Sequence, residues 1–211
     1  RRALIDALEA SNAQRTAEED RATIYILVFG GSQGARFLNE HVPALLEHVH
    51  QALPELDLRV VHQTGRHDEE ATRARYTATA LAGRVEVVSY IDDMPVAYQR
   101  ASLGICRAGA LTTAELTAAG LPSLLVPFPF AADNHQEANA QVLVEHGAAR
   151  MVRQAEWDVE ALSAWLVDLL SSPSKRQEMS RKARGLARPS AATMLVDDLE
   201  RLVSSPTKEA A

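Results

Sequence analysis

The chain has 211 residues, of which 46% are hydrophobic and 24% charged, a composition typical of a soluble globular protein. Its formal net charge of −6 argues against a nucleic-acid surface over most of the molecule, although it does not exclude a local basic pocket. Cys106 is the only cysteine, which excludes an intramolecular disulfide and favours a reducing compartment.

The chain begins with Arg1-Arg2 and runs directly into a helical pattern at Leu4, Ile5 and Leu8. This start, without a methionine, is expected for a piece cut from within a longer polypeptide. The longest apolar runs are of strand length, far short of the ~20 residues that a membrane-spanning helix needs. Neither a signal peptide nor a membrane span is therefore predicted.

Short apolar runs alternate with amphipathic stretches as far as residue 153, and the pattern is helical after residue 156. This alternation indicates βαβ units and a parallel sheet that is covered on both faces. We predict a doubly wound α/β domain with a helical C-terminal extension, whose first helix carries an apolar stripe from Val159 to Leu170. The predicted strands are 23–29, 56–62, 84–90, 102–106, 122–126 and 148–153, and the other predicted helices are 35–52, 67–80, 93–100, 111–119, 135–146, 175–187 and 190–203.

A glycine-rich turn, Gly30-Gly31-Ser32-Gln33-Gly34, joins the first strand to its helix. Such a turn aims unpaired backbone N–H groups and the positive end of the helix dipole at one point, which favours an anion, most often phosphate. The residue pattern of this turn matches neither the dinucleotide-binding fingerprint nor the P-loop. A turn whose glycines serve only packing remains an open alternative.

The loop after the fourth strand runs from Arg107 to Glu115 through small residues. A carboxylate one turn inside the following helix can accept two hydrogen bonds from a vicinal diol such as a ribose. The spacing from Thr112 to Glu115 equally fits a capping box, so both interpretations of Glu115 stay open.

Two further loops carry polar residues. In the segment Tyr90–Pro95, we interpret Asp92 or Asp93 as the cap of a helix rather than as a metal pair. The segment Pro127–Gln136, with Asn139 after it, can bind sugar hydroxyls or can simply form a polar helix start. The seven histidines lack metal-ligand spacing, so no metal site is predicted.

Taken in order, these loops resemble one family. The segments are GGSQGAR at 30–36, HQTG at 62–65, YIDDM at 90–94, RAGALTTAE at 107–115, GLP at 120–122 and PF…DNHQ…NA at 127–140. They are similar to the C-terminal half of the MurG family, the UDP-N-acetylglucosamine:lipid-linked muramyl-pentapeptide N-acetylglucosaminyltransferases of bacterial cell-wall synthesis. The resemblance covers residues 1 to about 203, essentially the whole chain.

The resemblance implies the C-terminal domain of a GT-B glycosyltransferase, in which two Rossmann-like domains enclose the active site. Residues 1–156 would form the Rossmann-like UDP-sugar-binding domain and 157–211 a helical extension of it. The N-terminal acceptor domain is absent from this chain. That domain would hold the lipid-linked acceptor, the general base and the membrane contact.

The resemblance also assigns roles to individual residues. Ser32 and the neighbouring amides would hold the diphosphate, Ile91 would meet the uracil edge, and Glu115 would bind the ribose hydroxyls. Gln136, with His135 beside it, would read the sugar hydroxyls. The full predicted donor site comprises Arg1, Gly31, Ser32, Gln33, Gly34, Ile91, Met94, Arg107, Ala110, Leu111, Thr112, Thr113, Ala114, Glu115, His135, Gln136 and Asn139.

The implied reaction is an inverting transfer of N-acetylglucosamine from UDP-N-acetylglucosamine to the muramyl 4-hydroxyl of the lipid-linked acceptor. No cofactor is expected, and a divalent ion is compatible with the reaction but not required. The intact enzyme would be peripheral, at the cytoplasmic face of the bacterial inner membrane, and this half alone would be inactive. A UDP-N-acetylglucosamine 2-epimerase and a non-catalytic UDP-sugar-binding module are the alternatives.

Overall fold

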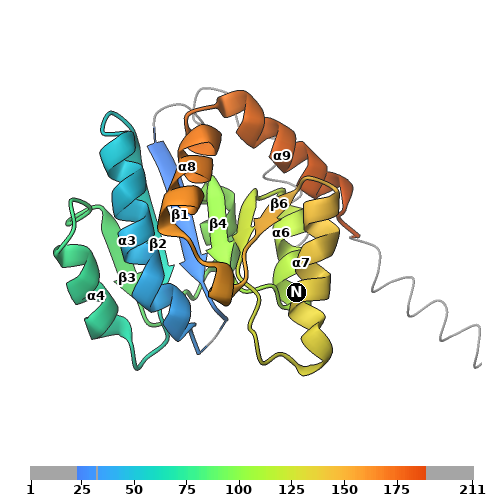
Figure 1. Cartoon of the computed structure of the whole chain (residues 1–211), viewed down its shortest axis with the longest axis horizontal. Helices are drawn as coiled ribbons and strands as arrows, with labels where there is room; N and C mark the ends of the chain where they lie inside the picture. The colour runs from blue at the N-terminus through green and yellow to red at the C-terminus, as the bar shows by residue number, and fades with distance from the viewer. Residues whose placement is uncertain (1–22, 32, 189–211) are drawn as a thin grey trace, which may run out of the picture.

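Six strands form one parallel sheet in the order β3-β2-β1-β4-β5-β6 (Figure 1). The structure, a computed structural model, describes residues 23–31 and 33–188. Strand β1 lies inside the sheet between β2 and β4, so the predicted doubly wound parallel sheet is confirmed. The strands are β1 (Thr23–Phe29), β2 (Asp57–Gln63), β3 (Val85–Val88), β4 (Leu103–Cys106), β5 (Ser123–Leu125) and β6 (Ala149–Met151).

The connections between the strands are helical, as the alternation predicts. The helices are α3 (Arg36–Ala52), α4 (Glu69–Thr77), α5 (Met94–Arg100), α6 (Ala110–Ala119), α7 (His135–Glu145), α8 (Val159–Leu170) and α9 (Pro173–Gly185), with short 3-10 turns η1 (Ala132–Asn134) and η2 (Gln154–Glu156). The predicted helix 190–203 and the polar stretch at 11–22 lie outside the described residues.

The two faces of the sheet have separate cores, because successive strand residues point to opposite sides. Ile26 and Val28 of β1 pack in a cluster with α3, α4 and α8, whereas Leu27 and Phe29 pack in a cluster with α5, α6 and α7. Strands β1, β4 and β5 therefore contribute apolar residues to both faces, which explains their continuous hydrophobic runs in the sequence.

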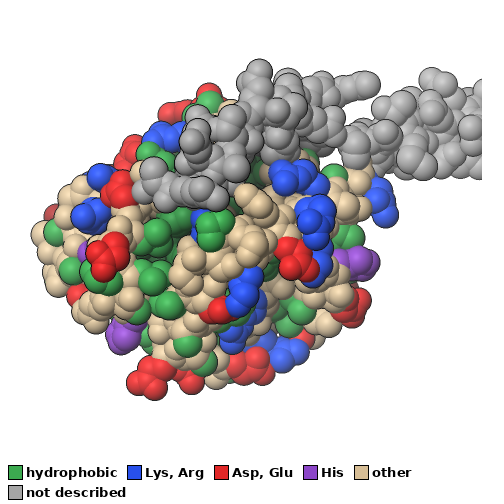
Figure 2. All heavy atoms as spheres, turned by 90° about the horizontal axis from the view of Figure 1, so that it is seen from above, with side chains coloured by type: hydrophobic (Ala, Val, Ile, Leu, Met, Phe, Trp, Pro, Cys, Tyr) green, Lys and Arg blue, Asp and Glu red, His purple; other side chains and the backbone are tan. Residues whose placement is uncertain are grey.

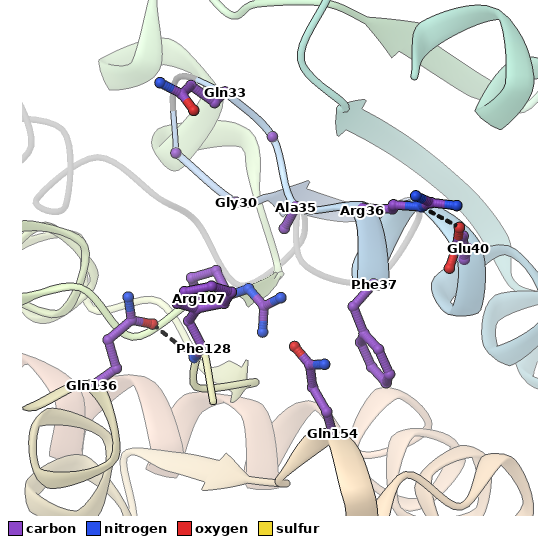
Figure 3. A pocket seen from close by; sticks show the side chains of 12 residues that line it. Gly30, Gln33, Ala35, Arg36, Phe37, Glu40, Arg107, Phe128, Gln136 and Gln154 are labelled. Carbon is purple, nitrogen blue, oxygen red and sulfur yellow. Dashed lines mark hydrogen bonds and ion pairs between the residues drawn. The ribbon is translucent and has the colours of Figure 1, made fainter. Parts of the chain in front are cut away.

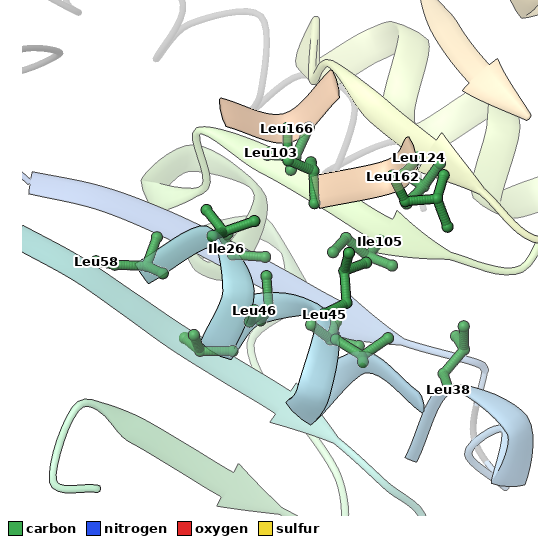
Figure 4. Close-up of a cluster of buried hydrophobic side chains, with 14 of the residues drawn as sticks. Ile26, Leu38, Leu45, Leu46, Leu58, Leu103, Ile105, Leu124, Leu162 and Leu166 are labelled. Carbon is green, nitrogen blue, oxygen red and sulfur yellow. The ribbon is translucent and has the colours of Figure 1, made fainter. Parts of the chain in front are cut away.

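Helix α8 belongs to the first of these cores rather than to a separate unit. Leu162 and Leu166 are buried against α3 and the sheet, in one cluster with Ile105 and Leu124 (Figure 4). The side chain of Asp158 caps the helix by accepting a hydrogen bond from the Ala161 amide at 3.0 Å. The helical stretch after residue 156 thus completes the cover of the sheet.

Acidic and basic side chains are interspersed among the described residues on the face seen in Figure 2. Within residues 23–31 and 33–188, no helix is both long and apolar enough to cross a membrane.

Candidate functional site

A cavity of about 660 Å³ opens at the carboxyl edge of the sheet, where the winding direction reverses between β1 and β4. In open α/β sheets, ligands bind at this position. We call it the edge cavity (Figure 3). Its walls are formed by Gly30, Gly31, Gln33, Gly34, Ala35, Arg36, Phe37, Glu40, Arg107, Phe128, Gln136 and Gln154.

The glycine-rich turn forms one wall of the edge cavity and leads into helix α3. Gly31 has φ = 90° and Gly34 has φ = 75°, backbone conformations that glycine adopts without strain. Ala35 is the N-cap of α3, and among the described residues no side chain caps that end and no acidic residue lies in its first turn. The first amides of α3 are therefore suited to an anion. Ser32 lies outside the described residues.

Packing explains part of the glycine pattern. A Cβ added to Gly34 would lie 1.8 Å from the Thr64 carbonyl oxygen, and one added to Gly65 would lie 2.1 Å from the Gln33 carbonyl oxygen. The two glycines thus let the loops after β1 and β2 touch through their backbones. Gly31 has no neighbour within 4 Å of such a Cβ, so its backbone conformation is what favours glycine there.

A buried hydrogen-bonded chain supports the loop after β2. The Asn39 amide donates to the Thr64 carbonyl at 3.0 Å and to Asp68 at 2.9 Å, so its oxygen faces His62 Nε2 at 3.0 Å as acceptor. His62 Nε2 then carries the proton, and Nδ1 accepts from the Tyr76 hydroxyl at 2.9 Å. Burial lowers the pKa of His62 to about 3, so the ring is neutral in the folded protein.

Arg107 brings a desolvated positive charge to the edge cavity. Its guanidinium donates to the carbonyl oxygens of Val126 and Pro127, both at 3.0 Å, and lies over the Phe128 ring. The residue is 9% exposed, and burial lowers its pKa to about 10. It forms no ion pair within the described part of the chain. An anion bound in the cavity would supply the missing counter-charge.

Gln136 and Asn139 tie two loops to the start of α7. Gln136 Oε1 accepts from the Phe128 amide at 3.0 Å and from the Ala108 amide at 3.3 Å, and Asn139 Nδ2 donates to the Ala108 carbonyl at 3.0 Å. The preceding residues Asp133 and Asn134 both have positive φ, which these residue types tolerate better than most. Gln136 lines the edge cavity with its Nε2 free of hydrogen bonds to described residues, whereas His135 is exposed and contacts the Ala132 carbonyl.

The capping-box interpretation of Glu115 is wrong. Helix α6 begins at Ala110 with Gly109 as its N-cap, so Thr112 already lies inside the helix. Glu115 instead accepts a hydrogen bond from the Tyr98 hydroxyl at 3.0 Å. Tyr98 is buried, and burial followed by the charge of Glu115 raises its pKa well above the usual value.

The capping interpretation of the Asp92-Asp93 pair is confirmed, since Asp93 accepts from the Val96 amide at 3.1 Å. Both aspartates line a second cavity of about 320 Å³ beside α5, which also contains Ile91. Among the described residues, no group of three or more His, Cys, Asp or Glu side chains could hold a metal ion.

The predicted donor residues divide among several places. Gly31, Gln33, Gly34, Arg107 and Gln136 line the edge cavity. Ile91 lines the cavity beside α5, and Met94 packs near it against the second core. A third cavity, of about 460 Å³, lies between α6 and α7 and is lined by Ala110, Thr113, Ala114 and Asn139. Leu111 is exposed. Arg1 lies outside the described residues.

The sequence interpretation missed several residues of the edge cavity. Arg36, Phe37 and Glu40 lie in the first turns of α3, and Phe128 was treated only as part of a polar segment. Gln154 follows β6, so the rule that ligands meet the carboxyl ends of strands could have identified it.

Comparison with known proteins places this geometry in a family. The model of the glycosyltransferase family 28 C-terminal domain matches residues 25–195. The chain is 44% identical over 191 residues to a Saccharophagus degradans protein named UDP-N-acetylglucosamine--N-acetylmuramyl-(pentapeptide) pyrophosphoryl-undecaprenol N-acetylglucosamine transferase, covering 90% of this chain and 47% of that protein. The chain spans about half the length of the curated relatives it matches.

Two solved structures show the same fold. The crystal structure of Acinetobacter baumannii MurG has a TM-score of 0.79 and 37% identity, covering 90% of this chain and 55% of that one. A putative UDP-N-acetylglucosamine 2-epimerase from Listeria monocytogenes has a TM-score of 0.64 at 17% identity, covering 98% of this chain and 54% of that one, a likeness that shows the fold alone. The chain therefore belongs to the glycosyltransferase family 28 C-terminal domain family.

Proposed function

We propose that this chain is the donor-binding half of an inverting transferase. The enzyme would move N-acetylglucosamine from UDP-N-acetylglucosamine to the muramyl 4-hydroxyl of a polyprenyl-diphosphate-linked muramyl-pentapeptide, converting lipid I to lipid II in peptidoglycan synthesis. The observation that carries the proposal is the edge cavity. Among the described residues, the start of α3 has no side-chain cap and Arg107 has no ion pair, so both suit a diphosphate, and the relatives are named for a UDP-sugar donor.

The contribution of this half to catalysis would be electrostatic. The leaving UDP gains negative charge as the bond to the sugar breaks, and amides and cations already aimed at that charge stabilise the transition state. The start of α3 would contribute ~0.3–2 kcal/mol. Arg107, held by two backbone carbonyls, would add a charge-assisted contact without having to reorganise.

The nucleoside would lie toward α5 and α6. Ile91 would present its backbone to the uracil edge, and Glu115 would accept from the ribose hydroxyls. The contact from Tyr98 leaves Glu115 with a second carboxylate oxygen for this purpose. Gln136, with His135 near it, would contact the transferred sugar on the opposite side. Arg1 and Ser32 keep their proposed places at the donor.

The acceptor would be bound outside the described chain. The relatives are about twice as long as the part that matches, and we assign the lipid-linked acceptor, the general base and a membrane contact at the cytoplasmic face to the remaining half. No cofactor is proposed, and a divalent ion is not required. This half alone would bind the donor without turning it over.

No specific observation favours the epimerase alternative. An epimerase needs acid and base groups at C2 of the sugar, but Glu40 is the only carboxylate that lines the edge cavity among the described residues. Glu40 is already paired with Arg36 at 2.8 Å.

Calorimetry of this chain with UDP, UDP-N-acetylglucosamine and ADP tests the donor assignment. We expect binding of both uridine ligands and weaker binding of ADP. No heat with UDP, or equal affinity for ADP, would contradict the assignment. The transfer step is tested separately, by following UDP release from UDP-N-acetylglucosamine and lipid-linked acceptor by the longer protein that includes the acceptor half. A non-catalytic module would release none.

A further inference from the structure

Gln154 has a position in the edge cavity that none of the contacts above explains. It is the first residue of η2, directly after the short connection from β6. Its side chain points into the cavity across from the glycine-rich turn, near Arg107 and Phe37 (Figure 3). Its side-chain oxygen is buried and has no hydrogen-bond partner among the described residues.

An unpaired buried carbonyl is unfavourable, and most such atoms in native proteins have a partner. The backbone around Gln154 is nevertheless firmly held. Arg153 forms ion pairs with Glu137 of α7 and with Glu156, and Trp157 packs edge-to-face on Phe37 of α3 with ring centroids 5.4 Å apart. The backbone that carries the Gln154 side chain is therefore held by its neighbours on both sides, although the side-chain oxygen accepts no hydrogen bond from a described residue.

We infer that Gln154 is a specificity-determining residue whose carbonyl accepts a hydrogen bond from the transferred sugar of the donor. The inference rests on the proposed function, because it assumes that the cavity holds a UDP-sugar. The bonding partner is a hydroxyl or the acetamide N–H of the sugar.

The chemistry of the cavity separates the sugar from the diphosphate. An ionised diphosphate offers acceptors only, so it cannot satisfy a bare carbonyl. The groups that suit phosphate, the start of α3 and the Arg107 guanidinium, line the same cavity and are hydrogen-bond donors, whereas the Gln154 oxygen is an acceptor. Gln136, which we assign to the sugar, lines the same cavity as Gln154. A sugar between the two glutamines would give the Gln154 oxygen the donor that it lacks.

The test compares two ligands on Gln154→Met, which keeps the side-chain volume but removes the amide. UDP-N-acetylglucosamine should bind about 2- to 12-fold more weakly, the range for one neutral hydrogen bond, while UDP binding stays unchanged. The melting temperature should stay the same or rise, because the variant removes an unpaired polar atom. Gln177→Met, at an exposed position on α9, is the matched control and should change neither affinity.

A selective loss for the sugar nucleotide supports the inference. Equal losses for both ligands, or no loss for either, would overturn it. If Gln154→Met melts at a lower temperature, Gln154→Asn provides the same comparison with the amide retained but drawn back, and a selective loss is again required. A wild-type chain that binds neither ligand would overturn the proposed function, and the inference with it.

Discussion

Arg107 offers the sharpest test of the donor site, because its charge is buried, unpaired among the described residues and directed at the cavity. Arg107→Met removes the guanidinium and keeps an apolar stem of similar length against Phe128. Arg107→Lys keeps the charge but loses the planar fork, so a single ammonium cannot serve both backbone carbonyls and a phosphate equally well.

The expected loss follows from the contact that would be removed. A hydrogen bond to a charged group contributes ~1.5–3 kcal/mol, so Arg107→Met should weaken UDP binding by about 10- to 150-fold. Arg107→Lys should recover part of that loss. Uridine lacks the diphosphate, so its affinity should remain nearly unchanged in both variants. Although burial lowers the pKa of Arg107 to about 10, the guanidinium is still charged at neutral pH, so its contribution should be present there.

Calorimetric titration of UDP and uridine on the wild type and both variants measures these losses. Thermal melts must accompany it, because the carbonyls of Val126 and Pro127 lose a donor in Arg107→Met. Arg59→Met is the control, since Arg59 lies on β2 away from the edge cavity and pairs with Asp57. Equal weakening of UDP and uridine, or unchanged UDP binding by a folded Arg107→Met variant, would refute the reasoning.

Three further predictions concern the core, the buried histidine and the ribose contact. Leu166→Ala should lower the free energy of unfolding by ~2–5 kcal/mol in denaturant titration, and a loss below ~1 kcal/mol would mean that α8 contributes little to the core. His62 is neutral when folded and its pKa of about 3 lies below the unfolded value, so its stabilising contribution is present above pH ~6.5 and is lost toward pH 3. Unfolding should therefore become easier by up to ~1.4 kcal/mol per pH unit in that window, and His62→Gln should flatten the slope; an identical slope in the variant would contradict this. Glu115→Ala should weaken UDP binding by ~10- to 150-fold and Tyr98→Phe by ~2- to 12-fold, and both should reduce discrimination against 2′-deoxy-UDP; unchanged discrimination would remove this pair from the site.

The fold could be predicted because its signals are local. Runs such as Ile24–Phe29 are apolar at every position, which only a sheet covered on both faces requires. The ends of the helices and strands were harder to predict from the sequence. The predicted strand 84–90 ends at Val88, and Tyr90 is 54% exposed, because apolar composition does not show where a strand leaves the sheet.

The start of α6 shows a limit of helix-start motifs. The spacing of Thr112 and Glu115 fits a capping box, but Gly109 takes the extended N-cap conformation three residues earlier. For Asp93 the sequence motif was sufficient. An aspartate directly before a Met-Pro helix start is typical of an N-cap, and the Asp93 side chain does cap α5. Whether a two-residue motif caps a helix thus depends on the backbone conformation around it.

The parts of the site that sequence could not supply are contacts between distant segments. The hydroxyl of Tyr98 on α5 contacts Glu115 on α6, and Gln154 reaches the cavity from the 3-10 turn after β6. Neither residue type signals its role, because a tyrosine at helical spacing is usually core and a glutamine before a 3-10 turn is usually surface. Only the assembled sheet brings their atoms to one edge.

The loops around the edge cavity are joined to one another before any donor arrives. Gln136 holds the amides of Ala108 and Phe128 together, and Arg107 holds the carbonyls of Val126 and Pro127. The entropy of ordering this wall is therefore lost when the chain folds, not when a ligand binds. A donor site built in this way needs no acceptor half to assemble it, so binding and transfer can be divided between two domains. That division is consistent with the proposal that this chain binds UDP on its own, and that transfer also needs the part of the longer relatives that this chain does not span.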